Sequence, residues 1–228
     1  MTSLLLAAGS SVQLNFGKSL TKPSESILII LAVAVLAVAP ALLIMLTGFT
    51  RIAVVLGLTR NALGLQTIPP NQVIAGLALF LSLFIMQPTL SQMNQQALQP
   101  YLHGKINSTE AYHKAEVPLE HWMLKQTDTQ ELTLMTQAAH EHPAKPQDVS
   151  LVALVPAFVL SQLKSAFIIG FVIFVPFLII DLVVSAVLMS MGIMMLPPTL
   201  VSLPFKILLF VMIDGWTLIT HTLLTSFR

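Results

Sequence analysis

Two charged side chains, Asp181 and Lys206, stand inside long apolar runs of the sequence and are its best candidates for chemistry. Asp181 lies within residues 168–195, and Lys206 lies in the run that follows the prolines at 197 and 198. In a helical hairpin, the charges would lie 13 residues before and 12 residues after position 194, at nearly equal depth. A charge in hydrocarbon costs ~2.5 kcal/mol or more and usually has a partner. The spacing therefore predicts an ion pair between Asp181 and Lys206.

Three roles for Asp181 remain open on the sequence. It locks two helices through Lys206, carries protons or ions, or faces water in a pore or a partner subunit. Desolvation of a buried pair costs several kcal/mol per ion, so the expected use of a lock is to fix which helix faces which. Lys164 and Asp214 stand nearer the ends of their apolar runs, and we expect them to reach water by extending along the surface.

Motifs for catalysis or metal binding are missing from the sequence. The pair His140 and His142 flanks Glu141, but adjacent side chains on a helix diverge and no further ligand stands at a zinc-like spacing. The chain contains no cysteine, no glycine-rich phosphate loop, no HExxH and no GxSxG. We expect no catalytic residue, no metal and no cofactor, and hence no enzyme.

Composition indicates a membrane protein. The 228 residues are 55% hydrophobic and only 9% charged, whereas a soluble domain is about 25% charged. The formal net charge of +1 argues against nucleic acid as a partner, which a basic patch would favour.

The apolar runs predict an all-α fold with two helical hairpins. A spanning helix needs ~20 apolar residues, and the runs at 27–49, 166–195 and 200–224 are long enough, whereas 73–88 is short. The expected organisation is an N-terminal extracytoplasmic segment (1–26), a first hairpin (27–90), a helical extracytoplasmic segment (91–150) and a second hairpin with a methionine-rich turn (151–228).

The first turn is expected to be cytoplasmic because it carries Arg51 and Arg60 and no acid. Both termini would then lie outside. The apolar piece at 4–8 is too short for a signal peptide, which favours a mature chain whose leader has been removed.

The segment between the hairpins is predicted to hold two or three short amphipathic helices. Asn107 followed by Glu110, and Asp128 followed by Glu131, have the spacing of helix capping boxes.

Methionines gather at the second turn, at positions 189, 191, 194 and 195. They are ordinary apolar filling or, because the thioether side chain is flexible and adaptable, a closure that yields to a passing chain.

Several long motifs resemble the FliP family of flagellar type III export-gate proteins. They are FTRIAVVLGLTRNALGLQTIPPNQVIAGLALFLSLFIMQP, PLEHWMLKQT, FVPFLIIDLVVSAVLMSMGIMMLPP and LPFKILLFVMIDGW. The resemblance covers roughly residues 40–216 and favours the flagellar form over its virulence-secretion relatives.

This resemblance implies a pentameric pore, wound helically with FliQ-like and FliR-like small membrane subunits and joined by a larger export-gate membrane protein. The assembly would pass unfolded flagellar subunits across the bacterial inner membrane, within the flagellar basal body and with periplasmic termini. The implied gasket residues are Met191, Ile193, Met194 and Met195. The alternatives are the equivalent subunit of a virulence injectisome, an ion- or proton-coupled transporter using Asp181, and a passive scaffold.

The sequence departs from the family pattern at two positions. Ile193 replaces the first of three methionines, which would stiffen the gasket because isoleucine is branched. Gln162 replaces an acid, which leaves Asp181 as the stronger candidate partner for Lys206.

Overall fold

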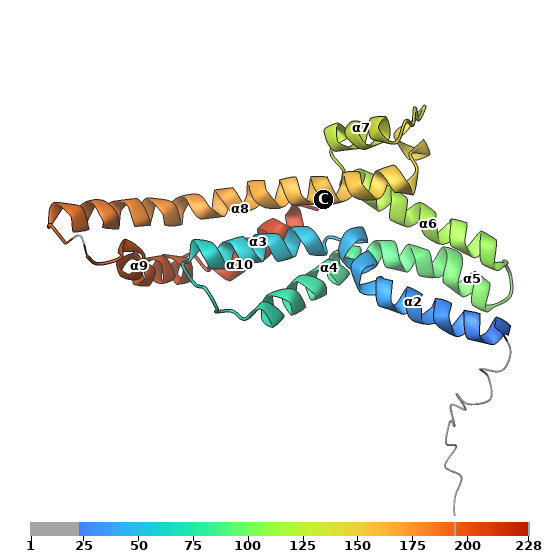
Figure 1. Ribbon diagram of the computed structural model, residues 1–228, viewed down its shortest axis with the longest axis horizontal. Helices are drawn as coiled ribbons and strands as arrows, with labels where there is room; N and C mark the ends of the chain where they lie inside the picture. The colour runs from blue at the N-terminus through green and yellow to red at the C-terminus, as the bar shows by residue number, and fades with distance from the viewer. Residues whose placement is uncertain (1–22, 194, 228) are drawn as a thin grey trace, which may run out of the picture. The chain divides into compact units, whose positions relative to one another are not determined.

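The protein is all-α, as predicted. The computed structural model describes residues 23–193 and 195–227, and every regular element in these ranges is helical (Figure 1). The helices are α2 (Pro23–Leu46), α3 (Phe49–Ala62), α4 (Asn71–Met93), the π-helix η1 (Asn94–Leu98), α5 (Gln99–Leu102), α6 (Ser108–Lys125), α7 (Thr129–Ala138), the 3-10 helix η2 (Pro146–Asp148), α8 (Leu151–Ser190), α9 (Pro198–Met212) and α10 (Gly215–Thr225).

The chain divides into two compact units. Residues Met1–Leu42 form the first, of which the structure describes most of α2, and residues Leu43–Arg228 form the second. Large side chains of α2 such as Leu36 and Val38 are exposed. All the candidate site residues within the described ranges lie in the second unit.

Two helices in the described ranges are long and apolar enough to cross a membrane. They are the continuous stretch Asn71–Leu102 and α8. The count rises to four if each of two bent pairs is one span, namely the end of α2 with α3, and α9 with α10. The bend of 64° between α9 and α10 lies at Asp214, whose backbone is left-handed.

The turn of the first hairpin was expected over residues 50–71, and that prediction is wrong, because most of this stretch is helix α3. One face of this stretch is buried, and its residues recur at helical spacing: Ile52, Val55, Leu56 and Thr59. A helix therefore buries more apolar surface here than a loop would. The true connection is residues 63–70, where Gly64 takes a positive φ of 78°.

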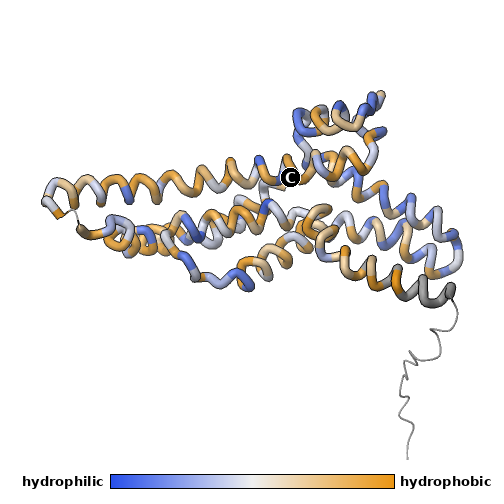
Figure 2. Tube along the Cα trace, in the orientation of Figure 1, coloured by the Kyte–Doolittle hydropathy of each residue, from blue (hydrophilic) through white to orange (hydrophobic). Residues whose placement is uncertain are grey.

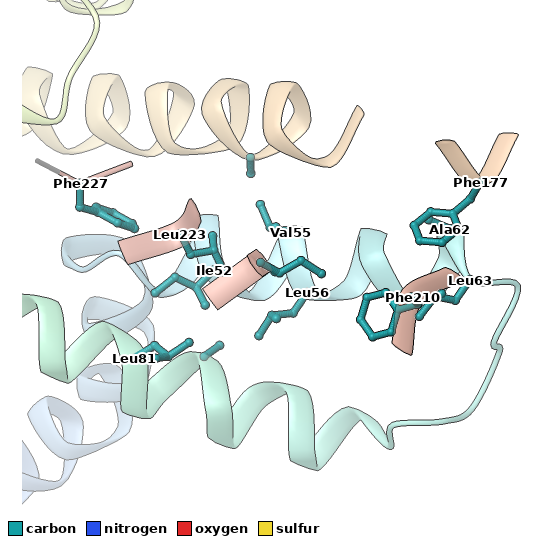
Figure 3. Packing of buried hydrophobic residues seen from close by; sticks show 13 residues of the cluster. Ile52, Val55, Leu56, Ala62, Leu63, Leu81, Phe177, Phe210, Leu223 and Phe227 are labelled. Carbon is teal, nitrogen blue, oxygen red and sulfur yellow. The ribbon is translucent and has the colours of Figure 1, made fainter. Parts of the chain in front are cut away.

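Helix α3 lies at the centre of the main core. Figure 3 shows Ile52, Val55 and Leu56 facing side chains from α4, α10 and the segment after it, while Phe177 and Phe210 close the cluster at the far end of α3. The close approach of α8 to α3 depends on Gly170, where a Cβ would lie 2.2 Å from Leu58 Cδ1.

Helix α8 runs unbroken for 40 residues through Pro156 and Pro176. Proline is tolerated in such helices where neighbouring groups satisfy the freed carbonyl. Figure 2 shows that most of α8 is apolar, whereas polar residues gather on α6 and α7.

Helices α6 and α7 confirm the predicted helical segment between the hairpins. Asn107 caps α6 by accepting a hydrogen bond from the Glu110 amide at 2.8 Å, and Asp128 caps α7 by accepting one from the Gln130 amide at 3.3 Å. A second core joins this segment to α8, with the rings of Trp122 and Phe158 5.2 Å apart.

Candidate functional site

Asp181 of α8 and Lys206 of α9 lie together in one chain. The Lys206 ammonium donates to Asp181 Oδ2 at 2.6 Å and to the carbonyl of Ala62 at 3.2 Å. Ser202 donates to the other carboxylate oxygen at 2.6 Å. The pair therefore joins α8 and α9 and also reaches the end of α3.

Burial within the pair is unequal. The Lys206 side chain is 5% exposed, whereas that of Asp181 is 30% exposed. The Ala62 carbonyl lies in the last turn of α3, where the helix dipole favours a cation. Lys206 is therefore shielded from solvent among its partners, whereas Asp181 keeps some contact with solvent.

The methionine turn follows a well-formed helix end. Met191 caps α8, the Gly192 amide donates to the Met189 carbonyl, and the Ile193 amide donates to the Leu188 carbonyl, both at 3.0 Å. These are the two bonds of a Schellman motif, and Gly192 has the left-handed φ of 73° that it requires. The backbone of the turn is thus fixed up to residue 193.

The side chains at the turn are exposed. Met195 is 98% exposed, Met191 66% and Ile193 40%, although all three are apolar. Met194, the fourth predicted gasket residue, lies outside the described residues. Such apolar exposure between α8 and α9 marks a candidate contact surface for protein or lipid.

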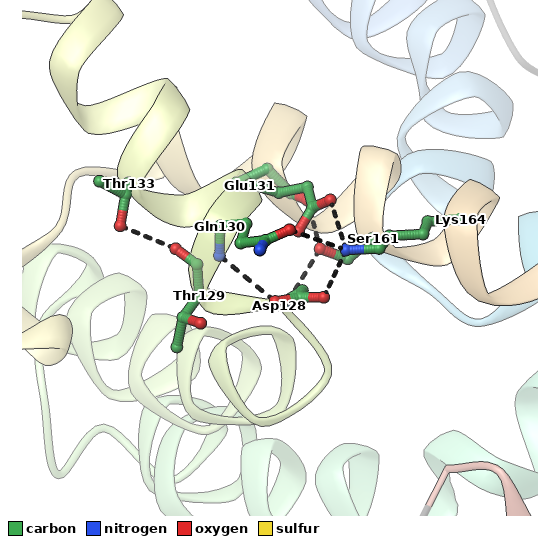
Figure 4. Close-up of polar contacts among 8 residues, drawn as sticks. Asp128, Thr129, Gln130, Glu131, Thr133, Ser161 and Lys164 are labelled. Atoms are coloured by element: carbon green, nitrogen blue, oxygen red, sulfur yellow. Dashed lines mark hydrogen bonds and ion pairs between the residues drawn. The ribbon is translucent and has the colours of Figure 1, made fainter.

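A second polar cluster, which the sequence analysis missed, surrounds Lys164. Its ammonium lies 2.7 Å from Asp128 Oδ2, 3.1 Å from Glu131 Oε1 and 3.4 Å from Gln130 Oε1 (Figure 4). Lys164 thus fastens α7 to α8, where we had expected it only to reach water. The capping spacing of Asp128 and Glu131 placed both acids in the first turn of a helix, but nothing in the sequence paired that turn with α8.

Lys164 also changes the titration of its partner. Its hydrogen bond to the carboxylate lowers the pKa of Asp128. The charged form of Asp128 is therefore favoured in the folded protein.

Arg51 and Arg60 lie on α3, and neither is a free loop charge. Arg51 is buried, stacks 4.1 Å from the centre of the Phe227 ring and donates to the Ser226 carbonyl at 2.7 Å. Arg60 donates to the Pro69 carbonyl at 3.1 Å and to Asn71 Oδ1 at 2.7 Å. The cytoplasmic placement of the first turn was based on these arginines as loop charges. Because both lie on a helix, the orientation of the chain in the membrane stays a prediction.

The remaining polar candidates do not form a further cluster in the part that the structure describes. Asp214 is exposed at the break between α9 and α10. Within residues 23–193 and 195–227, no three metal-ligating side chains come together, and Glu141 instead accepts hydrogen bonds from the amide and hydroxyl of Ser150. Gln162, at the position where an acid was expected, is buried and donates to the Gln126 carbonyl at 3.2 Å.

Comparison with known proteins decides the family. The model of the FliP family matches residues 32–223. The chain belongs to the FliP family. The Flagellar biosynthetic protein FliP of Bacillus subtilis (strain 168) is 54% identical over 205 residues, which are 90% of this chain and 93% of that protein. The proteins of the same name from Aquifex aeolicus (strain VF5) and Pectobacterium carotovorum are 41% and 46% identical, over 100% and 93% of this chain and 98% and 82% of theirs.

Family membership confirms the resemblance drawn from the motifs. The FliP relatives are named for flagellar biosynthesis. The long apolar helices of this chain are typical of membrane proteins. The protein thus belongs to a family named for flagellar biosynthesis and has helices long and apolar enough to cross a membrane.

Proposed function

We propose that this FliP-family chain is the core pore-forming subunit of the flagellar type III export gate. Its copies would pass unfolded flagellar subunits across the bacterial inner membrane while the flagellum is built. The observation that carries the proposal is the exposed apolar tip between α8 and α9, with Met195 98% exposed.

The tip suits a closure that opens for a polypeptide. Its backbone is held by the Schellman motif through residue 193, whereas the thioether side chains can take many conformations. Apolar side chains from several copies that meet on one axis would exclude water and ions by dewetting. An unfolded chain could then displace the side chains without moving the helices.

Much of the remaining exposed surface is apolar too. On α8 and α9 the exposed side chains include Phe171, Val172, Leu182, Val183, Leu208 and Val211. Such a surface supports assembly with further copies, with FliQ-like and FliR-like subunits and a larger export-gate protein, and contact with lipid. A pentamer, a place in the basal body and periplasmic termini belong to the same proposal.

An ion-leak measurement tests the closure. The Met191→Ala and Met195→Ala double variant should raise ion leak through the assembled complex by about tenfold, because the apolar constriction widens. Met212→Ala is the matched control, since Met212 is 76% exposed on α9 and lies away from the tip. Equal leak in the tip variant, the control and the unchanged protein would support a passive scaffold.

The mass of the purified complex tests the assembly. The chain should be expressed with the small membrane subunits proposed as its neighbours, purified in detergent and measured by native mass spectrometry. We expect five copies of this chain in the complex. A lone monomer would contradict the pore.

The transporter that uses Asp181 has less support. The Asp181 carboxylate accepts a hydrogen bond from Lys206 on one oxygen and from Ser202 on the other, an arrangement that favours a fixed pair over a carrier of protons or ions. A transporter would lose coupling on Asp181→Asn and keep its assembly, whereas a structural pair would lose assembly.

A further inference from the structure

The turn between α6 and α7, residues 126–128, is held by three nearby residues of α8. The Ser161 hydroxyl accepts a hydrogen bond from the Asp128 amide at 2.9 Å. Gln162 donates to the Gln126 carbonyl at 3.2 Å, and Lys164 pairs with the Asp128 carboxylate at 2.7 Å. The turn is therefore the point at which the segment between the hairpins is fastened to the second hairpin.

The same turn is also held from a distant part of the chain. The Gln126 side chain donates to the carbonyl of Phe227 at 2.9 Å. The backbone carbonyl of Gln126 thus bonds to α8 while its side-chain amide bonds to the segment after α10. One residue connects three elements that are far apart in the sequence.

Phe227 is seated firmly enough to act as an anchor. Phe227 is 7% exposed and its ring centre lies 4.1 Å from the Arg51 guanidinium, and Arg51 also donates to the carbonyl of Ser226. On the other side, a Cβ at Gly48 would lie 2.8 Å from the ring, so only glycine leaves room for it. Figure 3 shows the ring at the end of the core that α3 organises.

We propose that Phe227 is a positioning residue that fixes the α6–α7 turn through Gln126. Seating of Phe227 against Arg51 and Gly48 fixes the segment after α10 at the start of α3, and the bond to Gln126 then holds the segment between the hairpins against α8. Correct placement of that segment thereby depends on residues that follow α10. This coupling is independent of the pore closure proposed above, because the described residues of the turn, 191–193 and 195, take no part in it.

A cysteine reporter tests the coupling, because the chain has no cysteine of its own. Ala153→Cys places a thiol at a position 2% exposed in the core under α6, and Val152→Cys places one at the neighbouring position, 81% exposed. The ratio of their maleimide reaction rates in the purified full chain measures how often the segment leaves α8.

Phe227→Ala and Gln126→Met should each raise the ratio by about fivefold or more. Gln126→Met removes only the side-chain donor and leaves Phe227 seated. It therefore still tests the coupling if Phe227→Ala does not fold. Phe205→Ala, at a phenylalanine 55% exposed on α9, is the matched control and should leave the ratio unchanged.

A second control separates coupling from general loss of stability. Phe177→Ala opens the main core far along α8 from the turn, at a position 2% exposed. It should raise the ratio less than Gln126→Met does. An unchanged ratio in Gln126→Met, or an equal rise in Phe177→Ala, would overturn the proposal.

Discussion

At the scale of single residues, the two members of the ion pair, Asp181 and Lys206, differ in how deeply they are buried, and this difference has a measurable effect. Lys206 is 5% exposed and Asp181 is 30% exposed. Removal of one member of a buried pair leaves the other charge without compensation, and the cost grows with the burial of the charge that remains. The two single substitutions should therefore differ in effect.

Asp181→Asn should destabilise the protein by about 3–5 kcal/mol, because the buried Lys206 ammonium loses its counter-charge. Lys206→Met should cost less, since Asp181 keeps its hydrogen bond from Ser202 and some contact with water. Thermal unfolding of the purified protein in detergent would rank the two variants.

The double variant Asp181→Leu with Lys206→Met is the control for that ranking. It removes both charges, and Ser202 retains the Thr199 carbonyl as an acceptor. We expect it to be more stable than Asp181→Asn. If it were the least stable of the three, the pair would have a role other than mutual neutralisation.

At the scale of elements, the packing of α3 on α8 depends on a glycine. A Cβ at Gly170 would lie 2.2 Å from Leu58 Cδ1, closer than any two carbons can pack. In contrast, a Cβ at Gly57 on α3 would meet nothing within 4 Å. The same substitution should therefore act in opposite directions on two packed helices.

Gly170→Ala should destabilise by about 1–3 kcal/mol through overpacking. Gly57→Ala should be neutral or stabilising by up to about 1 kcal/mol, because alanine restricts the unfolded chain. Addition of Leu58→Ala should relieve part of the loss in Gly170→Ala. Thermal unfolding midpoints of the four proteins would show this, and a loss of the same size in Gly57→Ala would contradict it.

At the scale of the whole molecule, the Lys164 cluster makes attachment of the segment between the hairpins depend on pH. The pKa of Asp128 is lowered by Lys164, so the charged form stabilises the folded state. This contribution is complete above the ordinary carboxyl pKa of roughly 4 and is lost as the pH falls through the lowered value. Neutral pH therefore holds α7 on α8.

Trp122 fluorescence can follow this attachment, because Trp122 packs on Phe158 in the second core. A Trp216→Phe background leaves Trp122 as the one tryptophan, since the chain has two. Its emission should shift to the red as the pH falls below about 4. Asp128→Asn should show much of that shift already at pH 7, and no difference between the two proteins would exclude the cluster as the cause.

The sequence alone determined the helical class, the membrane character and the family, because each is written in long continuous stretches. The membrane character follows from composition, which does not depend on which residues are in contact. The nearly equal spacing of Asp181 and Lys206 about the turn predicted their contact once a hairpin was assumed. The capping residues Asn107 and Asp128 were likewise readable, since a cap acts on its own helix.

Only the tertiary structure decided which faces meet. The residues of α3 resembled a turn because arginines flank a short apolar stretch, yet burial by α4, α8 and α10 makes that stretch the centre of the core. Lys164 with Asp128, and Gln126 with Phe227, are 36 and 101 residues apart in sequence. A hydrogen bond acts over about 3 Å in space. Residues so far apart in sequence come that close only in the folded chain, so a local sequence pattern could not predict either contact.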